Sequence, residues 1–174
     1  MGLPQQHPDQ ESSQQSTTQA QPQSAAPRDP SQLPPEALDL VTKLFDFARQ
    51  GKTPELRQYI TAGIPLNLTN HKGDTLLMLA SYYGQVETLQ MLLEKGADVN
   101  VLNDRGQSPI AGAVFKGYDE VVRVLVGGGA DPRAGQPNAV ESAMMFKRED
   151  CMRMFDIGEA EREEIAQRLP PSVR

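Results

Sequence analysis

The chain of 174 residues contains no Trp, one Cys and two His, and its aromatic content is only 5%. The single cysteine, Cys151, excludes an internal disulfide and a zinc site made of four cysteines, and it suits a reducing compartment. A core with so few aromatic residues must be built from Leu, Val, Ile, Ala and Met. The length allows one domain of ordinary size and a tail.

Long apolar runs and an excess of basic residues are also absent. No window approaches the roughly 18 apolar residues that a membrane span needs, and no Lys or Arg precedes Arg28, so we expect no secretory signal. The formal net charge of −6 argues against nucleic-acid binding, which normally requires a basic patch. We therefore expect a cytoplasmic protein, with the nucleus as an alternative, that binds neither membranes nor nucleic acid.

Residues 1–34 differ in composition from the rest of the chain. They contain nine Gln, six Pro and five Ser, and Leu3 and Leu33 are their only Leu, Ile, Val or Phe residues. Such a segment cannot bury enough apolar surface to offset the entropy lost on ordering. We predict a disordered, solvated tail, with self-association as the alternative role of a Gln-rich segment. Pro34-Pro35 marks the start of the folded domain.

The rest of the chain contains an internal repeat with a period of 33 residues. Several columns of residues recur at this spacing: Gly51, Gly84 and Gly117; Gly63, Gly96 and Gly129; Leu56, Leu89 and Val122; Asn67 and Asn100; Gly73 and Gly106; Ala80 and Ala113. So many residues in register at one period indicate a repeat architecture, in which each repeat is one supersecondary unit.

Each repeat unit is predicted to contain two short helices. Thr75 is expected to cap the first helix of one repeat, and Ser108 with Pro109 begins the equivalent helix of the next. Gly84 and Gly117 are expected to end these helices in the left-handed conformation.

A second apolar segment with helical spacing follows each of these glycines, over 86–93 and 121–126. The first of these segments is expected to end at Gly96. Residues Gly127, Gly128 and Gly129 are expected to be a weak spot where the other second helix frays early, because each interior helix glycine costs up to about 1 kcal/mol relative to Ala.

The segments from Gly73 to Ala80 and from Gly84 to Asn100 together resemble the ankyrin repeat almost position for position, and the 33-residue period is that of this family. The resemblance implies an all-α fold, an ankyrin-repeat solenoid of about four helix pairs with short β-hairpin or turn fingers. It divides the chain after the tail into a repeat domain over 35–157 and a C-terminal capping helix and tail over 158–174. The expected repeats are 36–67, 68–100, 101–133 and 134–157.

Two features depart from the family pattern. The family usually has a His three residues after the capping Thr, but here this position holds Met78, Ala111 and Glu141 in successive repeats. The support that this His gives to hydrogen bonds between repeats is therefore missing. The last repeat is also three residues short between Arg133 and Gln136, which predicts a capping repeat with little or no finger.

The end helices of a stack of repeats need one apolar face toward the stack and one polar face toward water. At the N-terminal end, Leu44 and Phe45 are expected to face the stack. At the C-terminal end, Ile165 and Leu169 are four residues apart and are expected to dock a short final helix on the last pair.

No set of residues indicates catalysis. Gly51-Lys52-Thr53 lacks the Gly that a phosphate-binding loop needs five residues earlier, because Asp46 occupies that position. His71 is the only histidine outside the tail, and it is expected two repeats away from Cys151, which we predict to be a packing thiol. We expect no enzymatic activity, no cofactor and no metal, although a small-molecule enzyme remains a rival hypothesis.

In the ankyrin family, partners usually contact the finger tips and the exposed side of the first helix of each pair. Aromatic and Arg side chains, which often anchor interfaces, occur at several of these positions. Carried over to this chain, the tip positions are Thr69, His71, Lys72, Asp74, Leu102, Asp104, Arg105 and Gln107, and the first-helix positions are Tyr82, Tyr83, Phe115, Lys116, Met145 and Phe146.

The sequence thus predicts a non-enzymatic adaptor or regulator, expected to be a monomer, that binds one protein partner through the concave surface of fingers and inner helices. One alternative is an assembly chaperone that shields a basic client, which the net charge of −6 motivates. Another is a shortened copy of a longer ankyrin protein without a function of its own.

Overall fold

The computed structural model describes residues 35–169, so the predicted disorder of residues 1–34 lies outside the described residues. Within the described range the chain forms helices joined by turns. Their bounds are α1 (Pro35–Gln50), α2 (Thr53–Thr61), α3 (Leu76–Tyr82), α4 (Val86–Glu94), α5 (Pro109–Lys116), α6 (Asp119–Gly127), α7 (Ala139–Met145), α8 (Glu149–Met154) and α9 (Glu159–Arg168).

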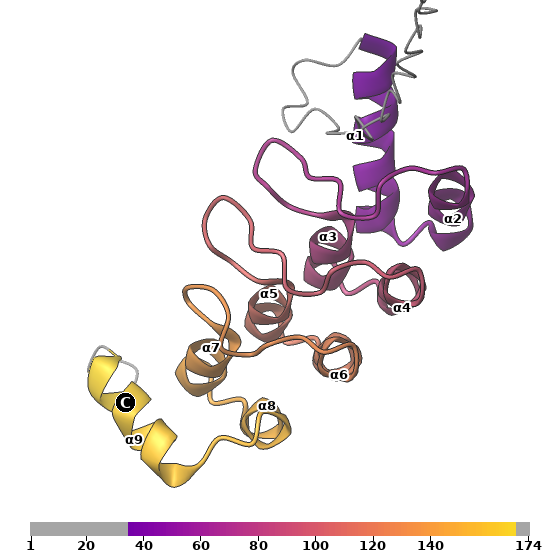
Figure 1. Cartoon of the computed structure of the whole chain (residues 1–174). Coiled ribbons are helices and arrows are strands. Elements are labelled where there is room, and N and C mark those ends of the chain that lie inside the picture. Colours follow the sequence, from indigo (N-terminus) through magenta and orange to yellow (C-terminus); the bar gives the residue numbers. More distant parts are fainter. Residues whose placement is uncertain (1–34, 170–174) are drawn as a thin grey trace, which may run out of the picture.

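The helices stack in two rows (Figure 1). Helices α1, α3, α5 and α7 form one row, here called the inner row, and α2, α4, α6 and α8 form the outer row, so that each pair packs against the next. Helix α9 packs against α7 at the end of the stack. The predicted all-α solenoid of four helix pairs is confirmed.

Three turns project beside the inner row and are called fingers 1, 2 and 3: residues 68–75, 101–108 and 131–138 (Figure 1). Residues 35–169 contain no β-strand, and one isolated bridge joins Thr69 to Thr75 at the base of finger 1. The fingers are therefore turns rather than β-hairpins. The last repeat is predicted to have little or no finger, but finger 3 is present and contacts finger 2, because the N–H of Gln136 donates to the carbonyl of Gly106 at 2.9 Å.

Side-chain caps begin the inner helices. The hydroxyl oxygen of Thr75 accepts from the N–H of Met78 at 3.1 Å, and that of Ser108 accepts from Ala111 at 3.3 Å, as predicted. Helix α7 begins with a capping box, in which Asn138 and Glu141 each accept from the other's backbone N–H. Glu141, at the position of the family's His, thus stabilises a helix start.

Glycines in the left-handed conformation end most of these helices. Gly84 and Gly117 have φ angles of 73° and 76°, and Gly96, after α4, has 92°. The early fraying of the second helix at the glycine triplet stays a prediction. Helix α6 ends at Gly127, and Gly129 has φ 86°, so the triplet forms the end of this helix.

The glycines that end the inner helices also allow close approach of the next repeat. A Cβ atom added to Gly51 would lie 2.3 Å from the side chain of Gln85, which donates from its amide to the carbonyl of Arg49 at 2.8 Å. The same contact recurs along the stack: Tyr118 lies on Gly84, and Arg148 lies on Gly117. This glycine column is therefore part of the interface between repeats.

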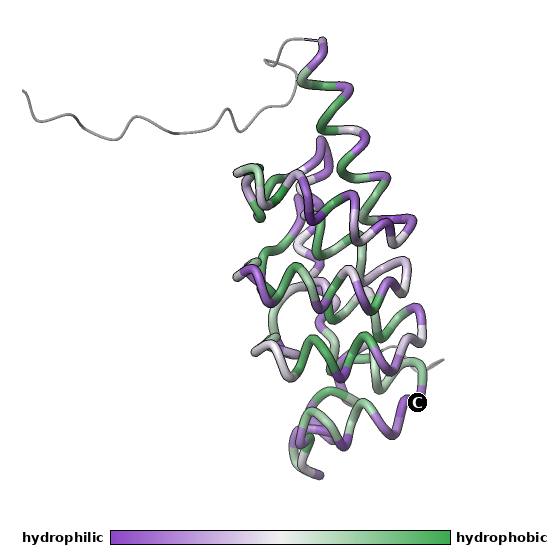
Figure 2. Tube along the Cα trace, turned by 90° about the vertical axis from the view of Figure 1, so that its right-hand side faces the viewer, coloured by the Kyte–Doolittle hydropathy of each residue, from purple (hydrophilic) through white to green (hydrophobic). Residues whose placement is uncertain are grey.

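The core runs through the whole stack as one hydrophobic cluster, and apolar segments recur in every layer of helices (Figure 2). Leu76, Ile110 and Leu125 are fully buried between neighbouring repeats. At the ends, Leu44 and Ile165 are buried, and Leu169 packs against the core. The predicted docking faces of the end helices are confirmed.

Two asparagines 33 residues apart connect neighbouring repeats. The side-chain oxygen of Asn67 accepts from the N–H of Asp98 at 2.9 Å, and that of Asn100 accepts from Asp131 at 2.8 Å. Asn100 also donates to the carbonyl of Gly129 at 3.2 Å. Hydrogen bonds between repeats are thus made without the family's His.

We predict that Gly96→Val destabilises the domain by about 1–3 kcal/mol, because a β-branched residue is strained at φ 92°. The space around Gly96 is open, so the loss would report backbone strain alone. Urea unfolding measures the effect. Gly127→Val is the control, since its surroundings are equally open and its φ is not left-handed. Equal unfolding midpoints for the two variants would contradict the assigned helix end.

We also predict that Asn138→Ala costs about 1 kcal/mol, because it removes the side-chain oxygen that accepts from the N–H of Glu141 at the start of α7. Asn138→Ser keeps an acceptor at the same position and should stay within a few tenths of a kcal/mol of the unmodified protein. Chemical denaturation compares the two. If both variants unfold at the same denaturant concentration, the cap does not stabilise the last repeat.

Candidate binding groove

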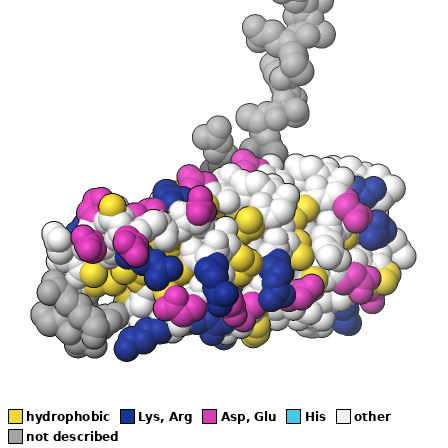
Figure 3. Space-filling view, turned by 90° about the horizontal axis from the view of Figure 1, so that it is seen from below, with side chains coloured by type: hydrophobic (Ala, Val, Ile, Leu, Met, Phe, Trp, Pro, Cys, Tyr) yellow, Lys and Arg dark blue, Asp and Glu magenta, His cyan; other side chains and the backbone are white. Residues whose placement is uncertain are grey.

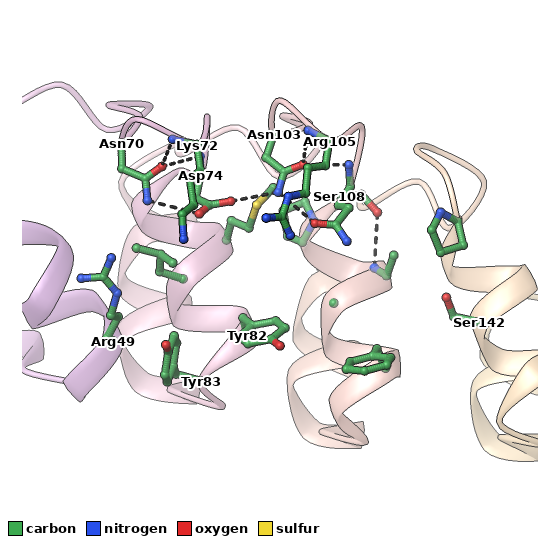
Figure 4. A pocket seen from close by; sticks show the side chains of 18 of the residues that line it. Arg49, Asn70, Lys72, Asp74, Tyr82, Tyr83, Asn103, Arg105, Ser108 and Ser142 are labelled. Carbon is green, nitrogen blue, oxygen red and sulfur yellow. Dashed lines mark hydrogen bonds between the residues drawn. The ribbon is translucent and has the colours of Figure 1, made fainter. Parts of the chain in front are cut away.

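A groove of about 530 Å³ lies between the fingers and the inner helices α3, α5 and α7. In Figure 4 the finger residues lie at one end of the groove, and Tyr82 and Tyr83 lie near the C-terminal end of α3. Ten of the fourteen predicted partner-binding residues line it: His71, Lys72, Asp74, Tyr82, Tyr83, Arg105, Gln107, Phe115, Met145 and Phe146.

An asparagine shapes each of the first two fingers. The side-chain oxygen of Asn70 accepts from the N–H groups of Lys72 and Asp74 at 2.8 and 3.0 Å. Asn103 does the same for Arg105 and Gln107, at 3.0 Å each. These bonds fix where the finger side chains emerge.

The carboxylate of Asp74 connects the first two fingers. Its two oxygens accept from the amide groups of Asn70 and Asn103, at 3.2 and 2.9 Å. The backbone adds a second connection, because the N–H of Asp104 donates to the carbonyl of Lys72 at 3.0 Å. Asp74 therefore has a structural role in this groove, which the sequence did not reveal.

Two pairs of exposed aromatic rings form the floor near the ends of the inner helices. Tyr82 and Tyr83 meet edge to face with ring centres 5.7 Å apart. Phe115 of α5 and Phe146, which follows α7, meet in the same way at 5.4 Å, although they belong to different repeats. Phe115 is 57% exposed and Phe146 46%. Such exposure of neighbouring aromatic rings is typical of binding surfaces.

Four predicted residues lie outside the groove lining. Thr69 forms the bridge at the base of finger 1 and is half-buried, and Asp104 is exposed on finger 2. Leu102 is also exposed on finger 2. Lys116 lies beside the groove, with its Nζ atom 4.9 Å from the ring centre of Tyr82.

Sequence reasoning missed several groove residues that lie in other parts of the repeat. Arg49 comes from the end of α1, and Ser142 and Pro137 belong to the last repeat. Met78, at the family's His position, is buried beneath the groove lining. The resemblance to the family singled out the position of Met78, whereas no pattern in the sequence indicated that Arg49 lines the groove.

The charge of the groove differs from that of the whole chain. Three cationic side chains, Arg49, Lys72 and Arg105, line it against one carboxylate, that of Asp74. Arg49 pairs with Asp46 at 2.6 Å, whereas Lys72 and Arg105 have no ion pair with any residue of 35–169. On the face shown in Figure 3, acidic and basic side chains are interspersed.

The candidate catalytic side chains, His71 and Cys151, do not lie close together. His71 is exposed on finger 1, whereas Cys151 is buried on α8 in the outer row. Burial, followed by the nearby Asp119 carboxylate, raises the pKa of the Cys151 thiol, which therefore stays protonated at neutral pH.

Among residues 35–169 no three His, Cys, Asp or Glu side chains are grouped as metal ligands. None of the helices within residues 35–169 has both the length and the hydropathy of a membrane-spanning segment.

Comparison with known proteins gives consistent matches. A family profile described as "Ankyrin repeats (3 copies)" matches residues 44–136. An ankyrin repeat protein of Pseudomonas aeruginosa is 51% identical over 59 residues, a match that covers 34% of this chain and 34% of that protein. The crystal structure of the human ASB11 ankyrin repeat domain aligns with a TM-score of 0.58 and 28% identity, over 64% of this chain and 52% of that one.

The profile match spans more than half of the chain and contains fingers 1 and 2, the glycine column and most of the groove. The Pseudomonas match spans about a third of that protein's length. The periodicity, the helix pairs and these matches agree. The chain belongs to the ankyrin-repeat family.

Proposed function

We propose that this protein is a non-enzymatic adaptor or regulator that binds one protein partner in the groove between its fingers and inner helices. Ankyrin repeats are generally protein–protein interaction modules and typically non-enzymatic. The observation that carries the proposal is the aromatic floor, in which Phe115 and Phe146 from neighbouring repeats are both exposed and in contact. Partner binding would cover apolar surface that is otherwise in contact with water.

The mechanism is complementarity of shape and charge on a preformed surface, without turnover. The finger hydrogen bonds and the packed inner helices hold the groove before a partner arrives, so little ordering entropy is lost on binding. The aromatic rings would be the energetic centre and the finger side chains the polar rim. A standard interface buries about 800 Å² per partner, and this surface suits one contact of at most that size.

The chaperone alternative, with a basic client, receives no support from the groove. Its motivation is the net charge of −6, but the groove itself carries more cationic than anionic side chains. Placement in the cytoplasm or nucleus and the monomeric state stay predictions.

The proposal is tested by affinity capture from a lysate of the producing cells, with the full chain as bait. Tyr82→Ala combined with Phe115→Ala should reduce retention of the partner by tenfold or more, because loss of anchor residues typically costs above about 2 kcal/mol of binding free energy. Both side chains are exposed, so the thermal unfolding midpoint should change little.

The matched control replaces two exposed residues of the outer row, Gln90→Ala with Arg123→Ala. It should retain the partner as the unmodified chain does. If the groove variant retains the same proteins as the control, the partner does not use the groove and the proposal fails.

A further inference from the structure

The groove is cationic within an acidic protein. The chain has 23 acidic and 17 basic residues, yet three cations and one carboxylate line the groove. Interfaces arrange complementary potentials, so a local charge opposite to the net charge indicates the sign of the partner. The net charge of −6 disfavours anionic molecules at long range, whereas the groove presents the opposite charge at short range.

The cations of the finger rim are available, whereas the carboxylate is not. Lys72 and Arg105 are exposed and form no ion pair with residues 35–169. Both oxygens of Asp74 already accept hydrogen bonds from Asn70 and Asn103. An arriving carboxylate would therefore meet two unpaired cations, and the Arg105 guanidinium can bind a carboxylate through two parallel hydrogen bonds.

The aromatic floor requires apolar side chains on the same partner. Helix α3 has 7 residues and α5 has 8, so the floor lies about 10–12 Å from the rim at 1.5 Å per residue. An extended chain covers that distance in about three residues. Two neighbouring cations are too few for the basic stripe that nucleic-acid binding needs. The geometry thus fits a peptide better than a polyphosphate.

We propose that the groove binds an acidic peptide segment in extended conformation, with Asp or Glu side chains at Lys72 and Arg105 and an aromatic or aliphatic side chain about three residues away on the Tyr82–Phe115 floor. This inference rests on the proposed function, because it names the partner class of the same groove. It reverses the expectation that the net charge of −6 gives, namely a basic partner.

The experiment selects, from a library of displayed random peptides, those that bind the full chain. The peptides have about 12 residues and span about 40 Å when extended. Peptides that bind the unmodified chain and lose binding to the Tyr82→Ala/Phe115→Ala variant are taken as groove binders. We expect them to be enriched in Asp and Glu relative to the starting library and to contain at least one large apolar residue. Their affinity should fall as salt is raised, because exposed charges are screened over about 10 Å at 0.1 M and about 3 Å at 1 M ionic strength.

A charge reversal tests the rim directly. Lys72→Glu with Arg105→Glu should weaken the groove binders by about tenfold or more, because it turns attraction into repulsion at the contact. The control is Arg57→Glu with Lys95→Glu, which makes the same change in net charge at two exposed positions, one on α2 and one at the end of α4. It should leave the affinity for the groove binders within about twofold of that of the unmodified chain. The finger hydrogen bonds use the backbone of Lys72 and Arg105, so the reversal leaves the fold intact, which circular dichroism checks.

The possible outcomes separate the two proposals. Acidic groove binders that the rim reversal weakens and the control does not would support the inference. Two outcomes would overturn the inference while leaving the proposed function in place. Either the groove binders show no enrichment in Asp and Glu, or they bind the rim-reversal variant as tightly as the control variant. A selection that returns no peptide sensitive to the Tyr82→Ala/Phe115→Ala change would overturn both.

Discussion

The packing of each helix pair against its neighbours is the interaction on which the rest of this structure depends. A pair such as α3 and α4 is too small to bury its own apolar face, and Leu76 and Leu89 are fully buried because adjacent repeats cover them. Close approach is possible because glycines stand where the next repeat's side chains lie, as at Gly84 beneath Tyr118. Stability therefore accumulates along the stack, and α1 and α9 protect its ends.

The same contacts between repeats produce the groove. The fingers are held together by the bond from Asp104 to Lys72 and by the carboxylate of Asp74, and the aromatic floor includes a ring pair, Phe115 and Phe146, made by two repeats. A single repeat would contain none of these features. The proposed binding surface is a property of the assembled stack, and a change that separates two repeats should affect stability and binding together.

Electrostatics illustrates the difference between the chain as a whole and one surface of it. Net charge governs solubility and long-range encounter, but a partner in the groove meets a few side chains at short range. There, Lys72 and Arg105 outweigh a carboxylate whose oxygens are already bound. This local charge is the basis for proposing an anionic partner for an acidic protein.

The sequence by itself determined the 33-residue period, the helix pairs, the caps at Thr75 and Ser108 and the left-handed helix end at Gly96, because these depend on residues close together in the chain. It placed ten of the fourteen predicted residues around the groove, since family position fixes which face they occupy. Only the tertiary structure decided that Asp74 joins two fingers and that Arg49 joins the lining. Those contacts link residues of different repeats, and no local pattern of residues encodes them.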